Sequence, residues 1–449
     1  MTKNYITEPT KQIPVVYEAD VCVIGGSATG VFAAVRAARL GAKVVLVERA
    51  NCFGGVATGG LVNIWHTYYD TTGKKQIISG LSEEITDRIE PFNNGYRDYA
   101  DSHCFNPNEL KIELDRILNE SGVKYYLHTY YAGLMTDGNR ITAAFIENKD
   151  GRGAIKASFF IDATGDGDLA RDLNIESYTN PNIQPPSACF LMQGTFRGVD
   201  YQGLIREHGK EFGLENDWGW GGPVPRCRDI SLRAETHVFG VRCDRADDLT
   251  KAEVEGRRKM RALVEMLNKY SGTGDVYNIV SACSVIGIRE TVHYKTIWQA
   301  TEKALLCGER YDDAIMNGSY NVDVHLAGKG ITFRRLDGTY QTEGDDGSFI
   351  TGNWHEENGV KLEETPTYYQ LPFRCIVPEK WENFIAAGRM INADVGSFGA
   401  LRVMVNLNQI GEAAGVAAYL ALDRKQSVQQ LDGVDVAKLL AKGGSANLA

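Results

Sequence analysis

Residues 20–48 read DVCVIGGSATGVFAAVRAARLGAKVVLVE, and this stretch predicts a strand, a glycine-rich turn, a helix and a second strand. The run from Asp20 to Ile24 is mostly apolar and β-branched, which is typical of a strand buried on both faces of a parallel sheet. The helix is expected from Thr29 to Leu40 and the second strand from Lys43 to Val47. Together they make one βαβ unit, around which we interpret the remaining chain.

The turn GGSATG carries two of the three glycines of a GxGxxG dinucleotide fingerprint. Gly25 and Gly30 stand where a tight turn and close helix-to-strand packing are needed. Ser27 stands at the middle glycine position, where its Cβ either reduces the closeness to a pyrophosphate or is offset by a hydroxyl that donates to a phosphate oxygen. Arg36 and Arg39 are expected to point outward from the alanine-rich helix.

Glu48 ends the second strand, 23 residues after Gly25. A carboxylate at this spacing accepts hydrogen bonds from a ribose diol and repels a 2′-phosphate, so NADP is disfavoured. The positive end of the helix is expected to face the pyrophosphate. The alternative interpretation is an α/β turn that binds nothing, but the strand, turn, helix, glycine stop and terminal Glu stand in register.

Composition limits the other functions. The chain has 449 residues, which exceeds one compact core, and a net charge of −10 whose signs are interspersed, which argues against a nucleic-acid partner. The N-terminus lacks the layout of a signal peptide and no apolar run is long enough to span a bilayer, so we expect a cytoplasmic protein without a membrane partner. The nine cysteines form no CxxC pair, which disfavours a redox-active disulfide and iron–sulfur ligation, and no metal is expected. The oligomeric state is left open, a homo-oligomer included.

Further motifs follow in the first part of the chain. Four glycines lie between Gly54 and Gly60, which indicates a loop whose backbone approaches something closely, and His66 comes soon after it. Asn106 is expected to cap a helix that runs to about Asn119. Three strands joined by Asp-Gly turns then lead to IDATGDGD at 161–168, which places carboxylates at the end of a strand.

The segment from about 187 to 369 is predicted to be an inserted mixed α+β substrate domain, whereas residues 1–186 and 370–449 form the discontinuous cofactor domain. Within the insert we expect a helix opened by a capping box at Thr250 and Glu253, and a strand at 282–288 that delivers Arg289. After it, a strand at 383–387 leads to a small loop and a helix from about 401 to 421.

These motifs, together with VIGIRET at 285–291, LPFRCIVP at 371–378 and AAGRMINAD at 386–394, resemble the FAD-dependent oxidoreductase family of the two-dinucleotide-fold type. The resemblance covers most of the chain and implies an α/β fold: a Rossmann-like FAD-binding domain with a parallel sheet and a β-meander, plus the insert. It also implies the residues that hold FAD, which are Gly25, Gly26, Ser27, Ala28, Thr29, Gly30, Glu48, Arg49, Gly54, Gly55, Val56, Ala57, Tyr131, Ala163, Thr164, Gly165, Asp166, Gly388, Asp394 and Arg402.

The function predicted from these residues is hydride transfer between non-covalently bound FAD and a small organic substrate, which includes sugar- or polyol-like molecules. His66 is the candidate base and Arg289 the candidate substrate anchor. The electron partner is a quinone, oxygen, a protein carrier or a second substrate, because no second GxGxxG follows a later strand. The alternatives are an NAD-dependent dehydrogenase, which Glu48 also suits, and a non-catalytic flavin-binding protein.

Overall fold

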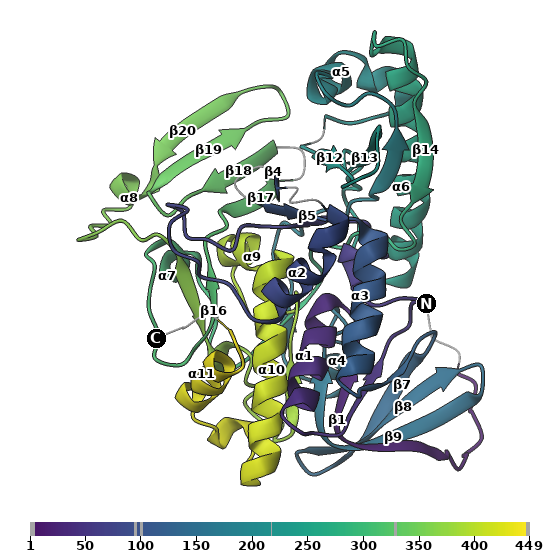
Figure 1. Cartoon of the computed structure of the whole chain (residues 1–449), viewed down its shortest axis with the longest axis vertical. Coiled ribbons are helices and arrows are strands. Elements are labelled where there is room, and N and C mark those ends of the chain that lie inside the picture. The colour runs from purple at the N-terminus through teal and green to yellow at the C-terminus, as the bar shows by residue number, and fades with distance from the viewer. Residues whose placement is uncertain (1–4, 94–96, 99–101, 217, 327–329, 446–449) are drawn as a thin grey trace.

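The computed structural model describes residues 5–93, 97–98, 102–216, 218–326 and 330–445. Its main sheet has seven strands within these ranges, in the order β6-β2-β1-β9-β8-β7, with β22 paired to β9 (Figure 1). The strands are β1 (Val15–Ile24), β2 (Val44–Val47), β6 (Lys124–Tyr126), β7 (Tyr130–Asp137), β8 (Arg140–Asn148), β9 (Gly151–Asp162) and β22 (Phe384–Ala386). Strands β6, β2, β1, β9 and β22 run parallel, whereas β7, β8 and the first half of β9 form an antiparallel meander.

Residues 21–24 of β1 and the whole of β2 are buried on both faces of the sheet, as their unbroken apolar sequence predicts. In β1, Val21 and Val23 belong to a core cluster on one face of the sheet, and Cys22 and Ile24 belong to a second cluster on the other face. Strand β2 alternates in the same way. Both faces are therefore covered, which is the arrangement expected of an α/β fold.

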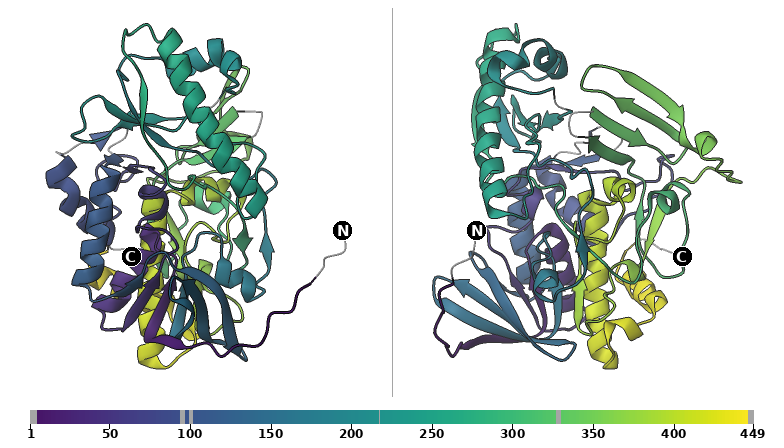
Figure 2. Two further views of the ribbon diagram at one scale, coloured as in Figure 1. Left: turned by 90° about the vertical axis from the view of Figure 1, so that its right-hand side faces the viewer. Right: turned by 180° about the vertical axis from the view of Figure 1, so that it is seen from behind.

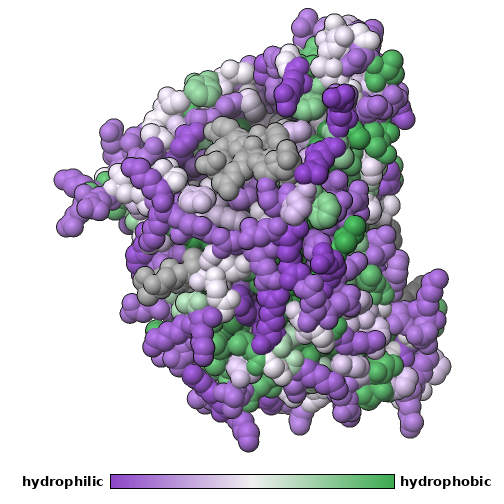
Figure 3. Space-filling view, viewed as in Figure 1, coloured by the Kyte–Doolittle hydropathy of each residue, from purple (hydrophilic) through white to green (hydrophobic). Residues whose placement is uncertain are grey.

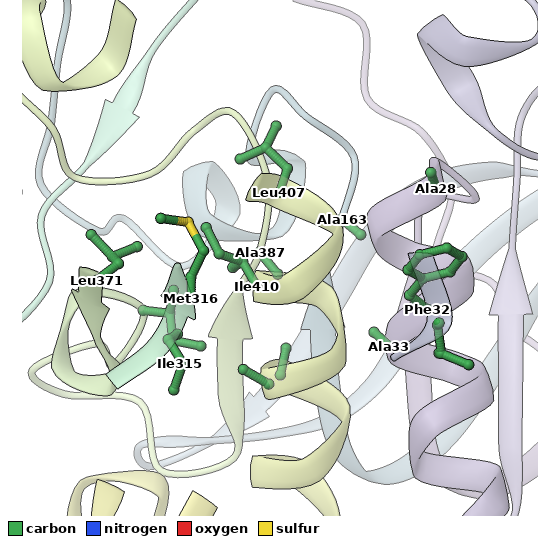
Figure 4. Packing of buried hydrophobic residues seen from close by; sticks show 14 of the residues in the cluster. Ala28, Phe32, Ala33, Ala163, Ile315, Met316, Leu371, Ala387, Leu407 and Ile410 are labelled. Atoms are coloured by element: carbon green, nitrogen blue, oxygen red, sulfur yellow. The ribbon is translucent and has the colours of Figure 1, made fainter. Parts of the chain in front are cut away.

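Two helices that are far apart in sequence cover one face of the sheet side by side (Figure 4). They are α1 (Ala28–Arg39) and α10 (Met404–Arg424). Glycines make their close contact possible, because a Cβ on Gly411 would lie 2.2 Å from the carbonyl oxygen of Thr29, and one on Gly415 would lie 2.3 Å from that of Ala33. The first and last parts of the chain thus form one layer.

Arg36 corrects one sequence expectation. It does not point outward: it is 4% exposed and forms an ion pair with Glu412 of α10. Its Nη1 also donates to the carbonyl oxygen of Gly443, at 2.6 Å. The sequence pattern does not reveal this burial, because the partner Glu412 lies 376 residues away in sequence. Arg39 does lie nearer the surface, paired with Glu84.

The remaining elements surround this layer (Figure 2). Between β2 and β6 lie β3 (Ile64–Trp65), α2 (Leu81–Asn93), β4 (Arg97–Asp98), β5 (Ser102–Cys104) and α3 (Pro107–Glu120), and β9 is followed by α4 (Asp168–Asp172). Next come β10 (Ser177–Tyr178), β11 (Phe190–Gln193), α5 (Tyr201–His208), β12 (Gly221–Pro223), β13 (Ile230–Arg233), α6 (Ala246–Tyr270), β14 (Asn278–Ala282), β15 (His293–Tyr294) and α7 (Glu302–Leu306). The last group is β16 (Ala314–Gly318), β17 (Val322–Leu326), β18 (Gly330–Arg334), β19 (Thr339–Glu343), β20 (Phe349–Asn353), α8 (Trp354–Glu357), β21 (Tyr369–Pro372), α9 (Val395–Leu401) and α11 (Gly433–Lys442).

A third core cluster lies apart from the main sheet. Apart from Leu61, it consists of residues between Ala188 and Ile286, and it includes the buried face of the long helix α6. By contrast, apolar residues between Ala300 and Trp354 belong to the same cluster as α1 and α10. The division into a cofactor domain and an insert at 187–369 stays a prediction.

On the face shown in Figure 3, hydrophobic residues lie scattered among hydrophilic ones.

Three element predictions need correction. Helix α6 begins at Ala246, four residues before the expected capping box, and the Thr250 hydroxyl donates back to the Ala246 carbonyl. The strand expected at 282–288 lies earlier in the chain, as β14, which ends at Ala282. The expected helix from about 401 to 421 is α10, shifted by three residues to 404–424; the short helix α9 before it is separate, because Val403 between them has extended backbone.

Candidate functional site

Three strands of the main sheet end side by side at one edge. Ile24 of β1 and Ala386 of β22 are both register partners of Asp162 in β9. The backbone continues this pairing, since the Ala163 amide donates to the Ile24 carbonyl at 2.7 Å and the Ala387 amide donates to the Asp162 carbonyl at 2.8 Å. The three predicted cofactor segments at 25–30, 163–166 and 388–402 therefore leave the sheet from the same edge, where ligands bind in open α/β sheets.

The turn at 25–30 is as tight as its glycines suggest. Gly25 has φ +101°, and a Cβ there would lie 2.4 Å from the backbone of Ala163. A Cβ on Gly30 would lie 1.9 Å from the carbonyl oxygen of Gly25. Ser27 caps α1, because its hydroxyl accepts from the Gly30 amide at 3.3 Å, and it donates to the Ala163 carbonyl at 3.3 Å. The serine hydroxyl is thus engaged within the turn, and its contact with a phosphate oxygen stays a prediction.

The glycine loop after β2 folds onto this turn. The Gly54 amide donates to the Gly26 carbonyl at 2.8 Å, and a Cβ on Gly55 would lie 3.3 Å from the Cβ of Ser27. Gly55 to Ala57 form a short 3₁₀ helix, which contains Val56. The loop and the first turn of α1, with Ala28 and Thr29, are therefore packed together.

Glu48 is 9% exposed and sits at the end of β2 beside the turn. Its two oxygens accept from backbone amides, Oε2 from Gly26 at 2.5 Å and Oε1 from Ala50 at 2.7 Å. These bonds fix the carboxylate beside the turn, and each oxygen keeps lone pairs for a ribose diol. Arg49 is exposed.

The segment at 163–166 is bound to the end of β22. Asp166 accepts from Arg389 Nη2 at 2.6 Å and from the Thr291 hydroxyl at 3.0 Å. Gly165, with φ +83°, leaves room for Arg389, since a Cβ would lie 3.0 Å from its Nε. Arg389 directly follows Gly388, which has φ +141°.

Three other predicted residues have their polar groups engaged within the protein. The Thr164 hydroxyl donates to Asp162 at 2.7 Å, and the Tyr131 hydroxyl donates to Asp172 at 2.9 Å. Asp394 caps α9, where its Oδ1 accepts from the Ser397 amide at 2.8 Å. Both of its oxygens also accept from the Glu302 amide. Asp394 therefore holds the start of α9 in place, and a direct contact with FAD stays a proposal.

A buried carboxylate, Asp323 in β17, organises the space next to these segments. Arg402 donates to its Oδ2 at 2.9 Å, and the Tyr320 hydroxyl donates to the same oxygen at 2.8 Å. The candidate base His66 packs on Tyr320 with 4.1 Å between ring centroids. His66 Nδ1 lies 3.5 Å from the Ser102 hydroxyl.

Two further histidines complete what we call the Asp323 cluster, which is His66, His237, Arg289, Tyr320, Asp323, His325 and Arg402. His325 Nε2 lies 3.6 Å from Asp323 Oδ1, and the rings of His325 and His237 lie 4.7 Å apart. The candidate anchor Arg289 donates from Nη1 to the Pro185 carbonyl at 2.8 Å and to the Ser187 hydroxyl at 2.6 Å. The positive charge of Arg289 lowers the pKa of Asp323. The candidate base His66 and the candidate anchor Arg289 therefore belong to the same cluster.

The electrostatics of the cluster keep its carboxylate charged and its imidazoles neutral. Burial alone raises the pKa of Asp323, but the charge of Arg402 and the Tyr320 hydrogen bond lower it to about 2. Burial lowers the pKa of His66 to about 4, and it lowers the pKa values of His237 and His325 well below their usual range. At neutral pH the cluster thus presents uncharged ring nitrogens beside an ionised carboxylate.

Sequence reasoning missed four members of the cluster, Tyr320, Asp323, His325 and His237. No short motif marks them, because three of them come from residues 320–325 and His237 comes from the distant segment between β13 and α6. A weak signal exists in the alternation of polar and apolar residues in NVDVHL at 321–326, which places Asp323 and His325 on one face of a strand.

The comparison with known families agrees with this geometry. The model of the family described as FAD dependent oxidoreductase matches residues 20–440 of the 449, so the chain belongs to that family. It is therefore a flavoenzyme, an oxidoreductase whose cofactor is FAD.

Individual relatives are distant. The mitochondrial dihydrolipoyl dehydrogenase of Schizosaccharomyces pombe is 28% identical over 159 residues, which span 33% of this chain and 28% of that protein. A geranylgeranyl bacteriochlorophyll reductase-like protein from Thermoplasma acidophilum is 11% identical, with a TM-score of 0.47 over 95% of this chain and 84% of its own. The p-nitrophenol 4-monooxygenase of Pseudomonas putida is 10% identical, with a TM-score of 0.46 over 95% and 85%.

The residues present fit FAD. The cradle formed by Gly25 and Gly30 leaves no room for a Cβ, and the N-terminus of α1 opens directly from it. Glu48 is held beside this turn, where its carboxylate has lone pairs that can accept hydrogen bonds from a ribose diol. Within the described residues, no helix combines the length and apolarity required to cross a membrane.

Proposed function

We propose that this enzyme transfers a hydride between a small organic substrate and non-covalently bound FAD, with the substrate held against the Asp323 cluster. FAD supplies the two-electron chemistry when it is bound. The observation that carries the proposal is the convergence of His66, Arg289 and Arg402 around the Asp323 carboxylate, next to the segments that fit FAD. Family membership favours this proposal over an NAD-dependent dehydrogenase or a non-catalytic flavoprotein.

His66 is proposed as the base that takes the proton of a substrate hydroxyl. Its ring is neutral at physiological pH, because burial holds its pKa near 4, so a ring nitrogen is available as an acceptor. The charge of Asp323 raises the pKa of His66, and it therefore stabilises the imidazolium that forms when His66 takes up the proton. Arg289 is proposed to orient the substrate through its planar guanidinium.

A sugar- or polyol-like substrate is the finer part of the proposal. Neutral imidazoles, the Tyr320 hydroxyl and an ionised carboxylate are groups that exchange hydrogen bonds with several hydroxyls at once. The electron partner, the cytoplasmic location, the absence of a nucleic-acid partner and the assembly state remain predictions from the sequence.

An anaerobic screen tests the proposal. Sugars, polyols, hydroxy acids and amines are mixed with the holoenzyme, and bleaching of the flavin absorption identifies a substrate. With that substrate, His66→Gln is expected to slow flavin reduction by about 10²- to 10⁴-fold, the usual contribution of a general base. The matched control is His208→Gln, since His208 stacks on Tyr270 outside the cluster. Equal rates in wild type and His66→Gln would exclude His66 as the base.

A further inference from the structure

Gln184 is a buried side chain that the protein leaves without partners. The residue is 1% exposed, and no described residue forms a hydrogen bond with either its amide nitrogen or its amide oxygen. Buried amides are nearly always paired, because an unmet donor or acceptor forfeits the hydrogen bonds that water would provide. A primary amide with both ends unmet therefore points to a ligand with a donor and an acceptor side by side.

The backbone around Gln184 connects it to the loop that follows β22. The backbone N–H of Gln184 donates to Glu290 Oε2 at 2.8 Å. The other oxygen of Glu290 lies 2.9 Å from His293 Nε2, and His293 Nδ1 lies 2.7 Å from the carbonyl oxygen of Ile391. Ile391 belongs to the loop between Gly388 and α9, one of the segments that leave the carboxyl edge of the sheet.

On its other side, the same segment is connected to the glycine loop after β2. Ser187 and Gly287 exchange two backbone hydrogen bonds, of 2.9 and 2.8 Å. A Cβ on Gly287 would lie 3.6 Å from Val62, and the Ser284 amide donates to the Gly59 carbonyl at 2.8 Å. Residues 184–187 are therefore connected, through residues 284–293, to both the glycine loop after β2 and the loop after β22, which carry predicted cofactor residues.

The position of Gln184 is also rigid. Pro185 and Pro186 follow it, so the backbone of this segment has little freedom and Gln184 itself is restricted to extended conformations. The Pro185 carbonyl is held by Arg289 at 2.8 Å. An amide fixed in this way is preorganised for one partner.

We propose that the Gln184 amide binds the pyrimidine edge of the flavin ring. This edge presents an imide N–H next to carbonyl oxygens, which complements an amide that offers one acceptor and one donor. The Gln184 oxygen accepts from the imide N–H, and the Gln184 nitrogen donates to a neighbouring flavin carbonyl. The inference rests on the proposed FAD site and adds the residue that recognises the ring end of the cofactor.

The test uses Gln184→Leu in the full-length protein, with Gln409→Leu as the matched control. Gln409 is also buried, but its amide is paired with both backbone groups of Asn317, at 3.1 and 2.9 Å. Removal of the flavin bonds is expected to weaken FAD binding about tenfold in Gln184→Leu. Without FAD, Gln184→Leu is expected to unfold at a temperature no lower than wild type, whereas Gln409→Leu unfolds at a lower one.

Two analogues locate the contact. FAD methylated at the imide nitrogen cannot donate there, so wild type is expected to bind it about tenfold more weakly than FAD, and Gln184→Leu is expected to bind both equally. ADP-ribose lacks the flavin ring, so both proteins are expected to bind it alike. Unchanged FAD affinity in Gln184→Leu, or an equal loss for ADP-ribose, would overturn the inference and leave the FAD site itself intact. Failure of wild type to bind FAD at all would instead overturn the proposed function.

Discussion

Three histidines around Asp323 are buried in their neutral form. Because burial disfavours their protonation, the stability of the fold depends on pH. Each has a pKa below the usual value of about 6.5, about 4 for His66 and well below the usual range for His237 and His325. At a pH between the unfolded pKa of about 6.5 and the lower folded pKa values, the unfolded chain binds protons that the folded chain does not. Stability therefore falls as the pH falls from about 6.5 towards 4.

His66→Gln is expected to make this pH dependence shallower, because one of the three proton-linked sites is removed. Between pH 6 and pH 5 the slope of the unfolding free energy should decrease by about 1 kcal/mol per pH unit, somewhat less than the ~1.4 kcal/mol per pH unit that a full proton contributes. Denaturant unfolding of both holoproteins across this range measures it. Identical slopes would show that His66 is protonated alike in the folded and unfolded states.

Sequence reasoning found only part of this cluster, for a physical reason. His66 and Arg289 attract notice because they stand near recognisable motifs, the glycine loop and VIGIRET. Asp323 and His237 stand near none, and their functional character depends on burial and on neighbours that are distant in sequence. A pattern of residue types does not contain that information.

At the scale of elements, local rules worked where local interactions decide. Asn106 caps α3 with its own side chain, and the two Asp-Gly turns join the strands of the meander as predicted. Local rules failed where a competing contact is stronger. Thr250 and Glu253 match a capping box, but Asp247 and Asp248 occupy the favourable first turn of α6, and Glu253 accepts from the distant Ile286 amide.

The close contact between α1 and α10 can be tested by substitution of its glycines. An alanine at Gly411 or Gly415 places a methyl group against the backbone of α1, so each variant is expected to lose about 1–3 kcal/mol of stability through overpacking. Only Gly411 faces Thr29, in the first turn of α1. Gly411→Ala is therefore expected to weaken FAD binding as well, because it displaces the helix end that faces the pyrophosphate.

Gly415→Ala is the control for this prediction, since it meets Ala33 one turn further from the cofactor end. Thermal unfolding and FAD titration of both variants separate the two effects. Equal losses of FAD affinity would mean that α1 moves as a rigid unit, and that the position of the glycine along the helix does not matter.

For the whole molecule, the arrangement of the hydrophobic cores decides how the chain divides. The sequence predicts an insert at 187–369 because regular strand and helix patterns weaken there, and this division stays a prediction. The structure gives residues 188–286 a core of their own, while residues from Ala300 onward pack with α1 and α10. Pattern strength does not reveal which core a segment joins, because that depends on long-range packing.

Two separate cores predict two cooperative unfolding transitions. Leu263 in α6 and Leu110 in α3 are both fully buried, one in each core, and Leu→Ala at such sites costs about 2–5 kcal/mol. In calorimetry, Leu263→Ala should lower one transition and Leu110→Ala the other. FAD should raise the transition that responds to Leu110, because the cradle at 25–30 lies against that core. If both variants and FAD instead shift one common transition, the shared contacts of residues 184–187 and 284–290 with the cofactor loops are strong enough to make the two cores unfold as one.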